Sequence, residues 1–237
     1  MTEWLTPPQR VDLHPHQAHV WRVSLSSMSP DESALSEDER QRASRFHFDT
    51  DRDRYVAAHA SLRGVLSRYL QCEPRELKFS TNEYGKPFLS GHEIEFNLSH
   101  SGSLALIAVA RGRKVGVDVE QIRADIEVES LAQRNFSPRE VSELMALKDE
   151  QRVIGFFNCW TRKEAYIKAQ GLGLSLPLDS FDVSLGEPAL LHATRPKAKE
   201  ASRWTLCSLE VESNYAAAFA VEGNNLEVQC WDWNINQ

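Results

Sequence analysis

Two carboxylates lie close together in a short valine-rich segment, and their spacing suits metal binding. Residues 115–120 read Val-Gly-Val-Asp-Val-Glu. Alternate side chains share a face of a strand, so Asp118 and Glu120 would point one way while the valines point the other. Such a pair offers hard oxygen ligands for Mg²⁺. A solvated strand face that ends at an exposed glutamate fits the same pattern, and this segment alone leaves both interpretations open.

A third carboxylate, Glu164, falls on the apolar stripe of a predicted long helix. The apolar members of this stripe are Val153, Phe157, Trp160 and Ile167. A carboxylate that faces a core is unfavourable unless it is paired or bound to a cation. Glu164 is therefore either half of a buried ion pair with Lys163 or Lys168, or a third ligand of the same cation. In the second case both lysines would neutralise phosphate oxygens nearby.

A small polar motif surrounds one histidine. Residues 96–102 read Phe-Asn-Leu-Ser-His-Ser-Gly. Asn97 and Ser99 would share one face of a strand, and His100 would open a hairpin loop over residues 100–103. Such a loop can offer backbone N–H groups and an imidazole to a phosphate. The other histidines are interpreted as structural or surface groups.

Positive charge is concentrated between residues 40 and 63. The six arginines there are Arg40, Arg42, Arg45, Arg52, Arg54 and Arg63. Acidic residues are interleaved with them, so a salt-bridged helix surface is one interpretation and bidentate phosphate binding is the other. Lys86, in the turn Tyr-Gly-Lys-Pro of residues 84–87, is either a further phosphate ligand or a solvated side chain.

The elements that would position these residues form a pattern that occurs twice. The first copy has a predicted strand at 18–25, helices at 36–46 and 51–70, and strands near 77–80, 94–99 and 104–110. The second has a strand at 114–120, helices from 137 and over 151–170, and strands near 180–185, 203–211 and 215–221. Capping-box patterns at Ser36 and Ser137 begin the two short helices. Gly171 ends the long helix over 151–170.

This order predicts an α+β fold made of two similar halves, residues 1–112 and 113–237. Direct sequence identity between the halves is weak, so a single α+β domain with a coincidental order of elements is the alternative.

Length and composition exclude several classes of protein. The 237 residues are 41% hydrophobic and 26% charged, which is typical of a globular chain. The net charge of −7 argues against general nucleic-acid binding. The longest apolar run, 104–110, is too short to span a bilayer, and the first ten residues lack the apolar region of a signal peptide. The four cysteines form no CxxC motif, and we expect reduced thiols and a cytoplasmic protein.

Taken in order, these segments resemble the 4′-phosphopantetheinyl transferases of the surfactin-synthetase type. The matching segments are 84–87, 96–102, 116–120, 160–168 and 171–178, and the arginine-rich stretch 42–63 is similar to the family's N-terminal segment. The resemblance implies a pseudo-dimer of two α+β halves with the active site in the cleft between them. It implies that the phosphopantetheine arm of coenzyme A is transferred to a serine of an apo acyl or peptidyl carrier protein, which releases adenosine 3′,5′-bisphosphate.

The same resemblance assigns roles to individual residues. It implies that Asp118, Glu120 and Glu164 hold Mg²⁺, with Mn²⁺ as an alternative cation. Glu164 would be the base for the serine hydroxyl, Lys168 would stabilise the leaving phosphate, and His100 would contact phosphate. The implied coenzyme A contacts are Arg42, Arg45, Arg54, Lys86, Ser99, His100, Asp118, Lys163 and Lys168. Some relatives have a basic residue where this chain has Glu39, so the contacts to the 3′-phosphate are expected to differ.

Two rival functions remain at this point. One is a different Mg²⁺-dependent phosphotransferase or nucleotide hydrolase. Three carboxylates would allow this function, but the sequence has no GxxxxGK[ST] loop, which argues against it. The other is a non-catalytic module that binds coenzyme A or a carrier protein, which the intact Asp118, Glu120, Glu164 and Lys168 disfavour. A monomer is expected, because one chain would supply both walls of the cleft.

Overall fold

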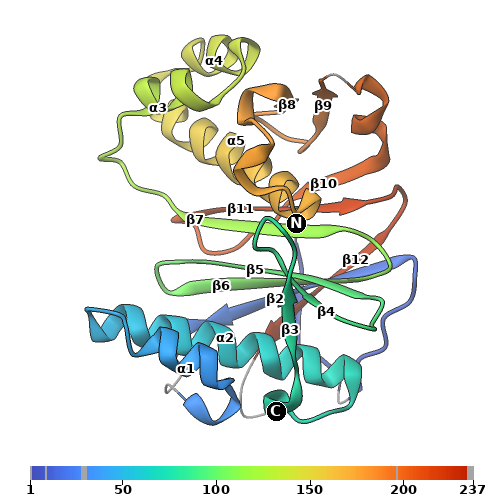
Figure 1. Ribbon diagram of the computed structural model, residues 1–237. Helices are drawn as coiled ribbons and strands as arrows, with labels where there is room; N and C mark the ends of the chain where they lie inside the picture. The colour runs from blue at the N-terminus through green and yellow to red at the C-terminus, as the bar shows by residue number, and fades with distance from the viewer. Residues whose placement is uncertain (1, 9, 28–30, 196, 234–237) are drawn as a thin grey trace.

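The computed structural model has four layers, with two sheets packed face to face between two groups of helices (Figure 1). It describes residues 2–8, 10–27, 31–195 and 197–233. In Figure 1, α1 and α2 lie below the lower sheet, and α3, α4 and α5 lie above the upper sheet. None of the helices in these ranges is long and apolar enough to cross a membrane.

Two main sheets and two small ones make up the β-structure. The first main sheet has the order β1–β12–β2–β6–β5, with β1 (Trp4–Leu5), β12 (Glu227–Trp233), β2 (Gln17–Ser24), β6 (Leu104–Arg111) and β5 (Ile94–Ser101). The second has the order β10–β11–β7, with β10 (Trp204–Ser208), β11 (Tyr215–Glu222) and β7 (Val115–Gln121). The small sheets pair β3 (Phe79–Thr81) with β4 (Pro87–Leu89) and β8 (Phe181–Val183) with β9 (Leu191–Thr194).

Two long helices, one on each sheet, dominate the helical layers. They are α2 (Asp49–Leu70) and α5 (Asp149–Gln170), and the shorter helices are α1 (Glu37–Ala43), α3 (Val128–Asn135) and α4 (Pro138–Met145). The 3₁₀ segments are η1 (Leu25–Ser27), η2 (Glu32–Ala34), η3 (Pro74–Glu76), η4 (Gly173–Ser175), η5 (Leu178–Ser180) and the longer η6 (Ala198–Arg203).

Local sequence signals explain where the helices begin and end. Capping boxes at Ser36 with Glu39 and at Ser137 with Glu140 start α1 and α4, as predicted. Gly171 ends α5 in the left-handed conformation, with φ of 68°. Both long helices begin two residues earlier than predicted, within the usual uncertainty of helix ends.

The two halves share one topology, which confirms the α+β fold of two similar units. The order β2–α1–α2–β3–β4–β5–β6 recurs as β7–α4–α5–β8–β9–β10–β11, with α3 added before α4. Each half contains an antiparallel three-stranded unit, β2–β6–β5 in one and β7–β11–β10 in the other. The division at residue 112 stays a prediction. The last strand, β12, pairs in parallel with β2 and so belongs to the sheet of the first half.

Three apolar clusters hold the layers together. One lies between α2 and the first sheet, one between α5 and the second sheet, and one between the two sheets. The inter-sheet cluster includes Val20, Leu106, Val117 and Phe219, all with exposures near zero. The strand β6 is apolar from Leu104 to Ala110 because one of its faces meets the other sheet and the opposite face meets α2.

Candidate active site

The two halves meet along a seam between β5 and β7, and polar side chains of β5 join it. Asn97 Oδ1 accepts a hydrogen bond from the Val117 backbone N–H at 2.9 Å. Ser99 Oγ and Ser101 Oγ accept in the same way from the N–H groups of Val119 and Gln121, at 3.4 and 3.1 Å. Side chains thus take the place of the backbone acceptors that a neighbouring strand would supply.

The two seam serines also hold the two carboxylates of β7. Ser99 Oγ donates to Asp118 Oδ1 at 2.9 Å, and Ser101 Oγ donates to Glu120 Oε2 at 2.9 Å. Each hydroxyl therefore accepts from the backbone of β7 and donates to the preceding side chain. Sequence analysis predicted that Asp118 and Glu120 share a face, and it did not identify Ser101 or the bonding role of Asn97. The signal available was the polar triplet at alternate positions 97, 99 and 101.

The β5 strand extends further than expected. The sequence predicted a loop over residues 100–103, whereas β5 continues to Ser101 and the turn lies at Gly102 and Ser103. Gly102 has φ of +57°, the left-handed conformation that glycine adopts readily. His100 therefore projects from a strand, on the opposite face from the two serines.

A glycine in β7 lets α5 approach the seam. A side chain at Gly116 would place its Cβ 2.2 Å from the Ala165 carbonyl oxygen and 2.3 Å from the Ala169 nitrogen. This close contact brings Lys168 against β7, where its Nζ lies 2.5 Å from Asp118 Oδ1 and 3.0 Å from Ser99 Oγ. Asp118 is thus paired with Lys168, a partner fifty residues away in the chain.

A cavity of about 290 Å³ lies at this junction and takes its walls from both halves. The first half contributes Asn97 and the turn 84–87, and α5 with the loop after it contributes Glu164, Ile167, Lys168, Gly171 and Gly173. Glu164 and Lys168, one helical turn apart, therefore face the same space. The structure brings Glu164, Lys168 and Lys86 to one cavity, and the roles that the resemblance implies for them stay predictions.

Counting partners among the described residues, the two lysines of this cavity each keep one unused N–H donor. Lys86 Nζ donates to the backbone carbonyls of Val115 and Ala169, at 3.0 and 3.3 Å. An ammonium group has three donors, so one remains on Lys86, and one remains on Lys168 after its bonds to Asp118 and Ser99. Burial lowers the pKa of Lys86 to about 8. A phosphate bound in the cavity would stabilise the charged form of Lys86 and raise its pKa again.

The carboxylates repel one another at this site. Burial raises the pKa of Glu120, and the negative charge of Asp118 raises it further. Burial also raises the pKa of Glu164, with added contributions from Asp118 and Glu120 and an opposing one from Lys168. Asp118 is almost fully buried, and its Oδ2 atom has no hydrogen-bond partner within the described residues.

These features fit a bound divalent cation. An unsatisfied buried carboxylate oxygen and mutually repelling carboxylates are what a cation would relieve. The residue types are the oxygen donors that Mg²⁺ prefers. In residues 2–8, 10–27, 31–195 and 197–233, no three His, Cys, Asp or Glu side chains are grouped closely enough to hold an ion as they stand. The ligand set Asp118, Glu120 and Glu164 therefore stays a prediction.

His100 lies in a region of positive charge. Desolvation lowers its pKa, and the neighbouring charges of His59, Lys168 and Arg54 lower it further. Such an environment disfavours a further cation and favours an anion. His59 was interpreted from the sequence as structural, and it stacks against Tyr55 with ring centroids 4.1 Å apart.

The predicted arginines divide into two groups. The Arg42 guanidinium lies over the Tyr55 ring at 5.6 Å, and Arg54 acts on His100, so both belong to this positive region. Arg45 is exposed after α1, and its backbone N–H donates to the Arg42 carbonyl at 3.1 Å. Within the described part of the chain, no side-chain contact joins Arg45 to the region. Glu39, which stands where some relatives have a basic residue, binds Arg63 at 2.6 Å and His59 at 3.2 Å.

Two residues expected to contact coenzyme A have other partners. Lys163 is fully buried, and its ammonium binds Glu140 at 2.8 Å and the carbonyls of Leu178 and Phe181 at 2.7 Å each. All three of its donors are therefore used inside the core. The Ser99 hydroxyl likewise has both acceptor sites and its single donor occupied within the seam. The structure thus differs from expectation for both side chains, because their hydrogen-bonding capacity is already satisfied.

The fold and the site define a two-halved α+β enzyme whose cavity lies where the halves meet. Two family models cover most of the chain. The model described as the 4′-phosphopantetheinyl transferase superfamily matches residues 114–220. The model described as 4′-phosphopantetheinyl transferase, N-terminal, matches residues 19–112.

Relatives match the chain over both halves. The 4′-phosphopantetheinyl transferase HetI of Nostoc is 39% identical over 97% of this chain and 98% of its own length. The 4′-phosphopantetheinyl transferase Sfp of Bacillus subtilis is 34% identical over 78% of this chain and 81% of its own. The holo-[acyl-carrier-protein] synthase of Thermotoga maritima aligns with 46% of this chain and 62% of its own at 20% identity, with a TM-score of 0.38. The chain belongs to the 4′-phosphopantetheinyl transferase family, in its two-halved form, and is a transferase of phosphopantetheine to carrier proteins.

Proposed function

We propose that the cavity between Lys86, Glu164 and Lys168 is where coenzyme A reacts, in a Mg²⁺-dependent transfer of its phosphopantetheine arm to a carrier-protein serine. One observation carries this proposal. Two ammonium groups with unused donors face the same cavity as a carboxylate whose pKa is raised. Phosphoryl-type displacement needs positioning and positive charge more than covalent help from the protein.

The substrate phosphates would be bound by groups from both halves. Lys86 and Lys168 would each donate their remaining N–H to the pyrophosphate. His100 with Arg54 near it, and Arg42 over the Tyr55 ring, would bind a further phosphate of coenzyme A. The charge pattern supports this division, because the arginines and His100 belong to the first half and Lys168 to the second.

Glu164 would accept the proton of the carrier serine. Its carboxylate lines the cavity beside Lys168, where a carrier serine would have to meet the pyrophosphate. The serine oxygen forms a bond to the phosphorus of the phosphopantetheine arm as the bond from that phosphorus to adenosine 3′,5′-bisphosphate breaks. The proton passes to Glu164, and the new charge on the leaving phosphate is stabilised by Lys168.

Asp118, Glu120 and Glu164 would hold Mg²⁺, with Mn²⁺ as an alternative. When bound, the cation supplies Lewis-acid stabilisation of charge on the pyrophosphate. Ser99 and Ser101 would fix the directions of Asp118 and Glu120. Asp118 would contact coenzyme A only indirectly, because the cation and Lys168 would lie between them.

The partners follow from the same proposal. The acceptors would be apo acyl or peptidyl carrier proteins. Neither nucleic acid nor a membrane would be a partner. A monomer would suffice, because one chain lines the cavity from both halves. The four cysteines are all free thiols, which supports a reducing, cytoplasmic setting.

A mass measurement tests this function. The protein is incubated with coenzyme A, Mg²⁺ and a panel of apo carriers from fatty-acid, polyketide and nonribosomal-peptide systems. The expected result is a mass gain of one phosphopantetheine on at least one carrier, and its loss when the carrier serine is replaced by alanine. No gain on any carrier would contradict the proposal, and coenzyme A hydrolysis without a carrier would favour a different phosphotransferase.

A further inference from the structure

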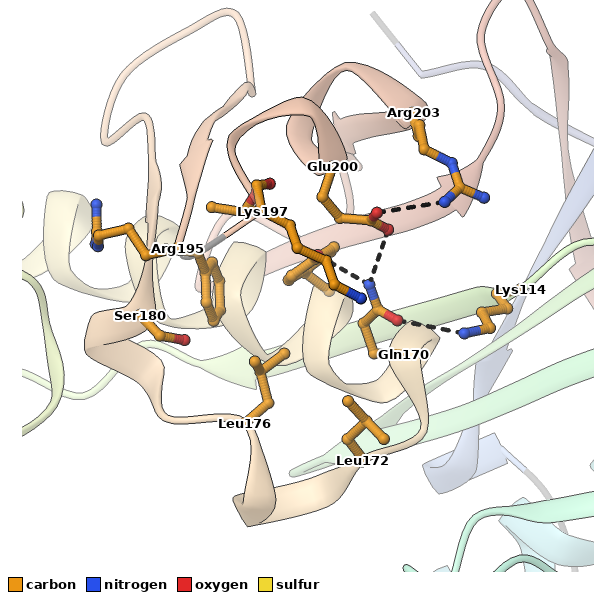
Figure 2. Close-up of a pocket in the computed structure, with 12 residues that line it drawn as sticks. Lys114, Gln170, Leu172, Leu176, Ser180, Arg195, Lys197, Glu200 and Arg203 are labelled. Atoms are coloured by element: carbon orange, nitrogen blue, oxygen red, sulfur yellow. Dashed lines mark hydrogen bonds and ion pairs between the residues drawn. The ribbon is translucent and has the colours of Figure 1, made fainter.

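A second cavity lies on the other side of α5 from the candidate active site. It has a volume of about 350 Å³ and is drawn in Figure 2. Tyr166 and Gln170 line it, whereas Glu164 and Lys168 line the first cavity. The two cavities therefore lie against different faces of the C-terminal part of α5. The loop after α5 separates them, with Gly171 and Gly173 on one side and Leu172 and Leu176 on the other.

One wall of this second cavity is apolar. Leu172 and Leu176 are half-buried and lie together in the lower part of Figure 2. The aromatic rings of Tyr166 and Phe181 complete the surface, with exposures of 3% and 1%. A cavity of this size with an apolar wall and a few polar groups has the character of a small-molecule site.

The opposite wall carries two lysines that form no direct ion pair with a carboxylate in the described part of the chain. Lys114 Nζ donates only to the neutral amide of Gln170, at 3.4 Å. Lys197 Nζ has no hydrogen bond or ion pair within the described part of the chain. Figure 2 shows Lys114 bonded to the Gln170 amide, and Lys197 lines the same cavity.

The acidic residue of this wall, Glu200, already has several partners. Glu200 accepts hydrogen bonds from Trp204 at 3.0 Å and from Arg203 at 3.3 Å, and it also faces the Gln170 amide. These contacts lower the pKa of Glu200, so it stays ionised and paired. Arg195 is likewise bound to Asp182. The charge of Lys197 also lowers the pKa of Glu200, and Arg203 is shared with Glu222. Within the described residues, Lys114 and Lys197 are therefore the cations of this cavity that form no direct ion pair.

We propose that this cavity binds a small amphiphilic anion, with its carboxylate or phosphate between Lys114 and Lys197 and its apolar body against Leu172 and Leu176. A single anionic group would gain two charge-assisted contacts there. The apolar body would be removed from water at the leucine and aromatic surface. This site is separate from the cavity proposed for coenzyme A, and its occupation does not depend on that proposal.

Isothermal titration calorimetry with four probes of the same chain length tests the chemistry. The probes are octanoate, octyl phosphate, octanol and octylamine, each titrated into the full-length protein. We expect both anions to bind, octanol to bind about tenfold more weakly, and octylamine not to bind. Equal affinity for octanol and the anions would overturn the anionic assignment, and no binding by either anion at millimolar concentration would overturn the site.

Charge-reversal variants locate the binding. Lys197→Glu and Lys114→Glu should each weaken octanoate binding about tenfold or more. Lys199→Glu is the matched control, because it is exposed two residues away and does not line the cavity. If Lys199→Glu weakens binding as much as Lys197→Glu, general surface charge explains the result and the proposal fails. Leu176→Ser should weaken the octyl probes while leaving thermal unfolding close to wild type.

Discussion

Arg63 and Lys163 occupy equivalent places in the two halves of the molecule. Each lies fourteen residues after the first residue of a 22-residue helix, and each is buried and paired with the glutamate of a capping box, Glu39 or Glu140. Each also donates to two backbone carbonyls further along the chain. This shared arrangement shows that both cations fix a short helix and a following segment onto a long helix.

Loss of Lys163 should therefore destabilise the fold. In Lys163→Met, the carboxylate of Glu140 would remain buried without its cation, at a cost of roughly 3–5 kcal/mol in the free energy of unfolding. Denaturant unfolding measures this change. Arg63→Met should cost a similar amount in the other half.

Arg139→Met is the control for that experiment. Arg139 pairs with Glu143 on the exposed surface of α4, so its loss should cost less than about 1 kcal/mol. If Lys163→Met is as stable as Arg139→Met but binds coenzyme A weakly, then Lys163 is a substrate contact and the structural role is wrong.

Ser101 should control metal affinity through Glu120. Ser101→Ala removes the hydrogen bond to Glu120 Oε2 and the acceptor for the Gln121 N–H. Removal of such an outer partner typically weakens metal binding by about 10–100-fold. Titration with Mn²⁺, followed by electron paramagnetic resonance without substrates, measures the affinity directly. Ser103→Ala, in the same hairpin but bonded to Tyr215, should leave it unchanged, and equal affinities for all three proteins would refute the role of Ser101.

His100 should contribute to coenzyme A binding rather than to the chemical step. We expect His100→Ala to raise KM for coenzyme A about tenfold, since a hydrogen bond to a charged phosphate is lost, with little change in kcat. Steady-state kinetics at varied coenzyme A measures both constants. His92→Ala, at an exposed position before β5, should behave as wild type. A fall in kcat without a change in KM would assign His100 to the chemical step.

His19 should make the fold sensitive to acid. It is fully buried, its Nδ1 lies 2.8 Å from the Tyr69 hydroxyl, and desolvation lowers its pKa to about 4. The unfolded state takes up a proton near pH 6.5, so this contribution to stability is complete above that pH and declines as the pH falls towards 4. The loss amounts to about 3 kcal/mol. Chemical denaturation between pH 7 and 4.5 should show a shallower slope for His19→Gln, and an identical slope would exclude His19 as the cause.

Local signals predicted much of the fold. The capping boxes at Ser36 and Ser137 and the terminal glycine Gly171 marked helix ends because they act within a few residues. The sequence did not predict β12, in which Glu227, Gln229 and Asp232 are interleaved with apolar residues. Its pairing with β2 joins residues more than 200 positions apart, and local patterns carry no information about such a register.

The candidate site shows the same division between local and distant effects. Period-two spacing placed Asp118 and Glu120 on one face, and helical spacing placed Glu164 and Lys168 one turn apart. The partner of Lys163 could not be predicted, because Glu140 comes from another helix and approaches only in the folded core. Charge alone did not distinguish a lysine used inside the core from one that faces a cavity.

The most direct test of the proposed chemistry is carrier modification by Glu164→Gln, measured by mass spectrometry with coenzyme A and Mg²⁺ present. The proposal predicts that this variant folds and binds coenzyme A but adds no phosphopantetheine to a carrier that the wild type modifies. Asp118→Ala should likewise lose transfer while remaining folded. Transfer by Glu164→Gln at a rate near that of the wild type would contradict the assignment of Glu164 as base and metal ligand.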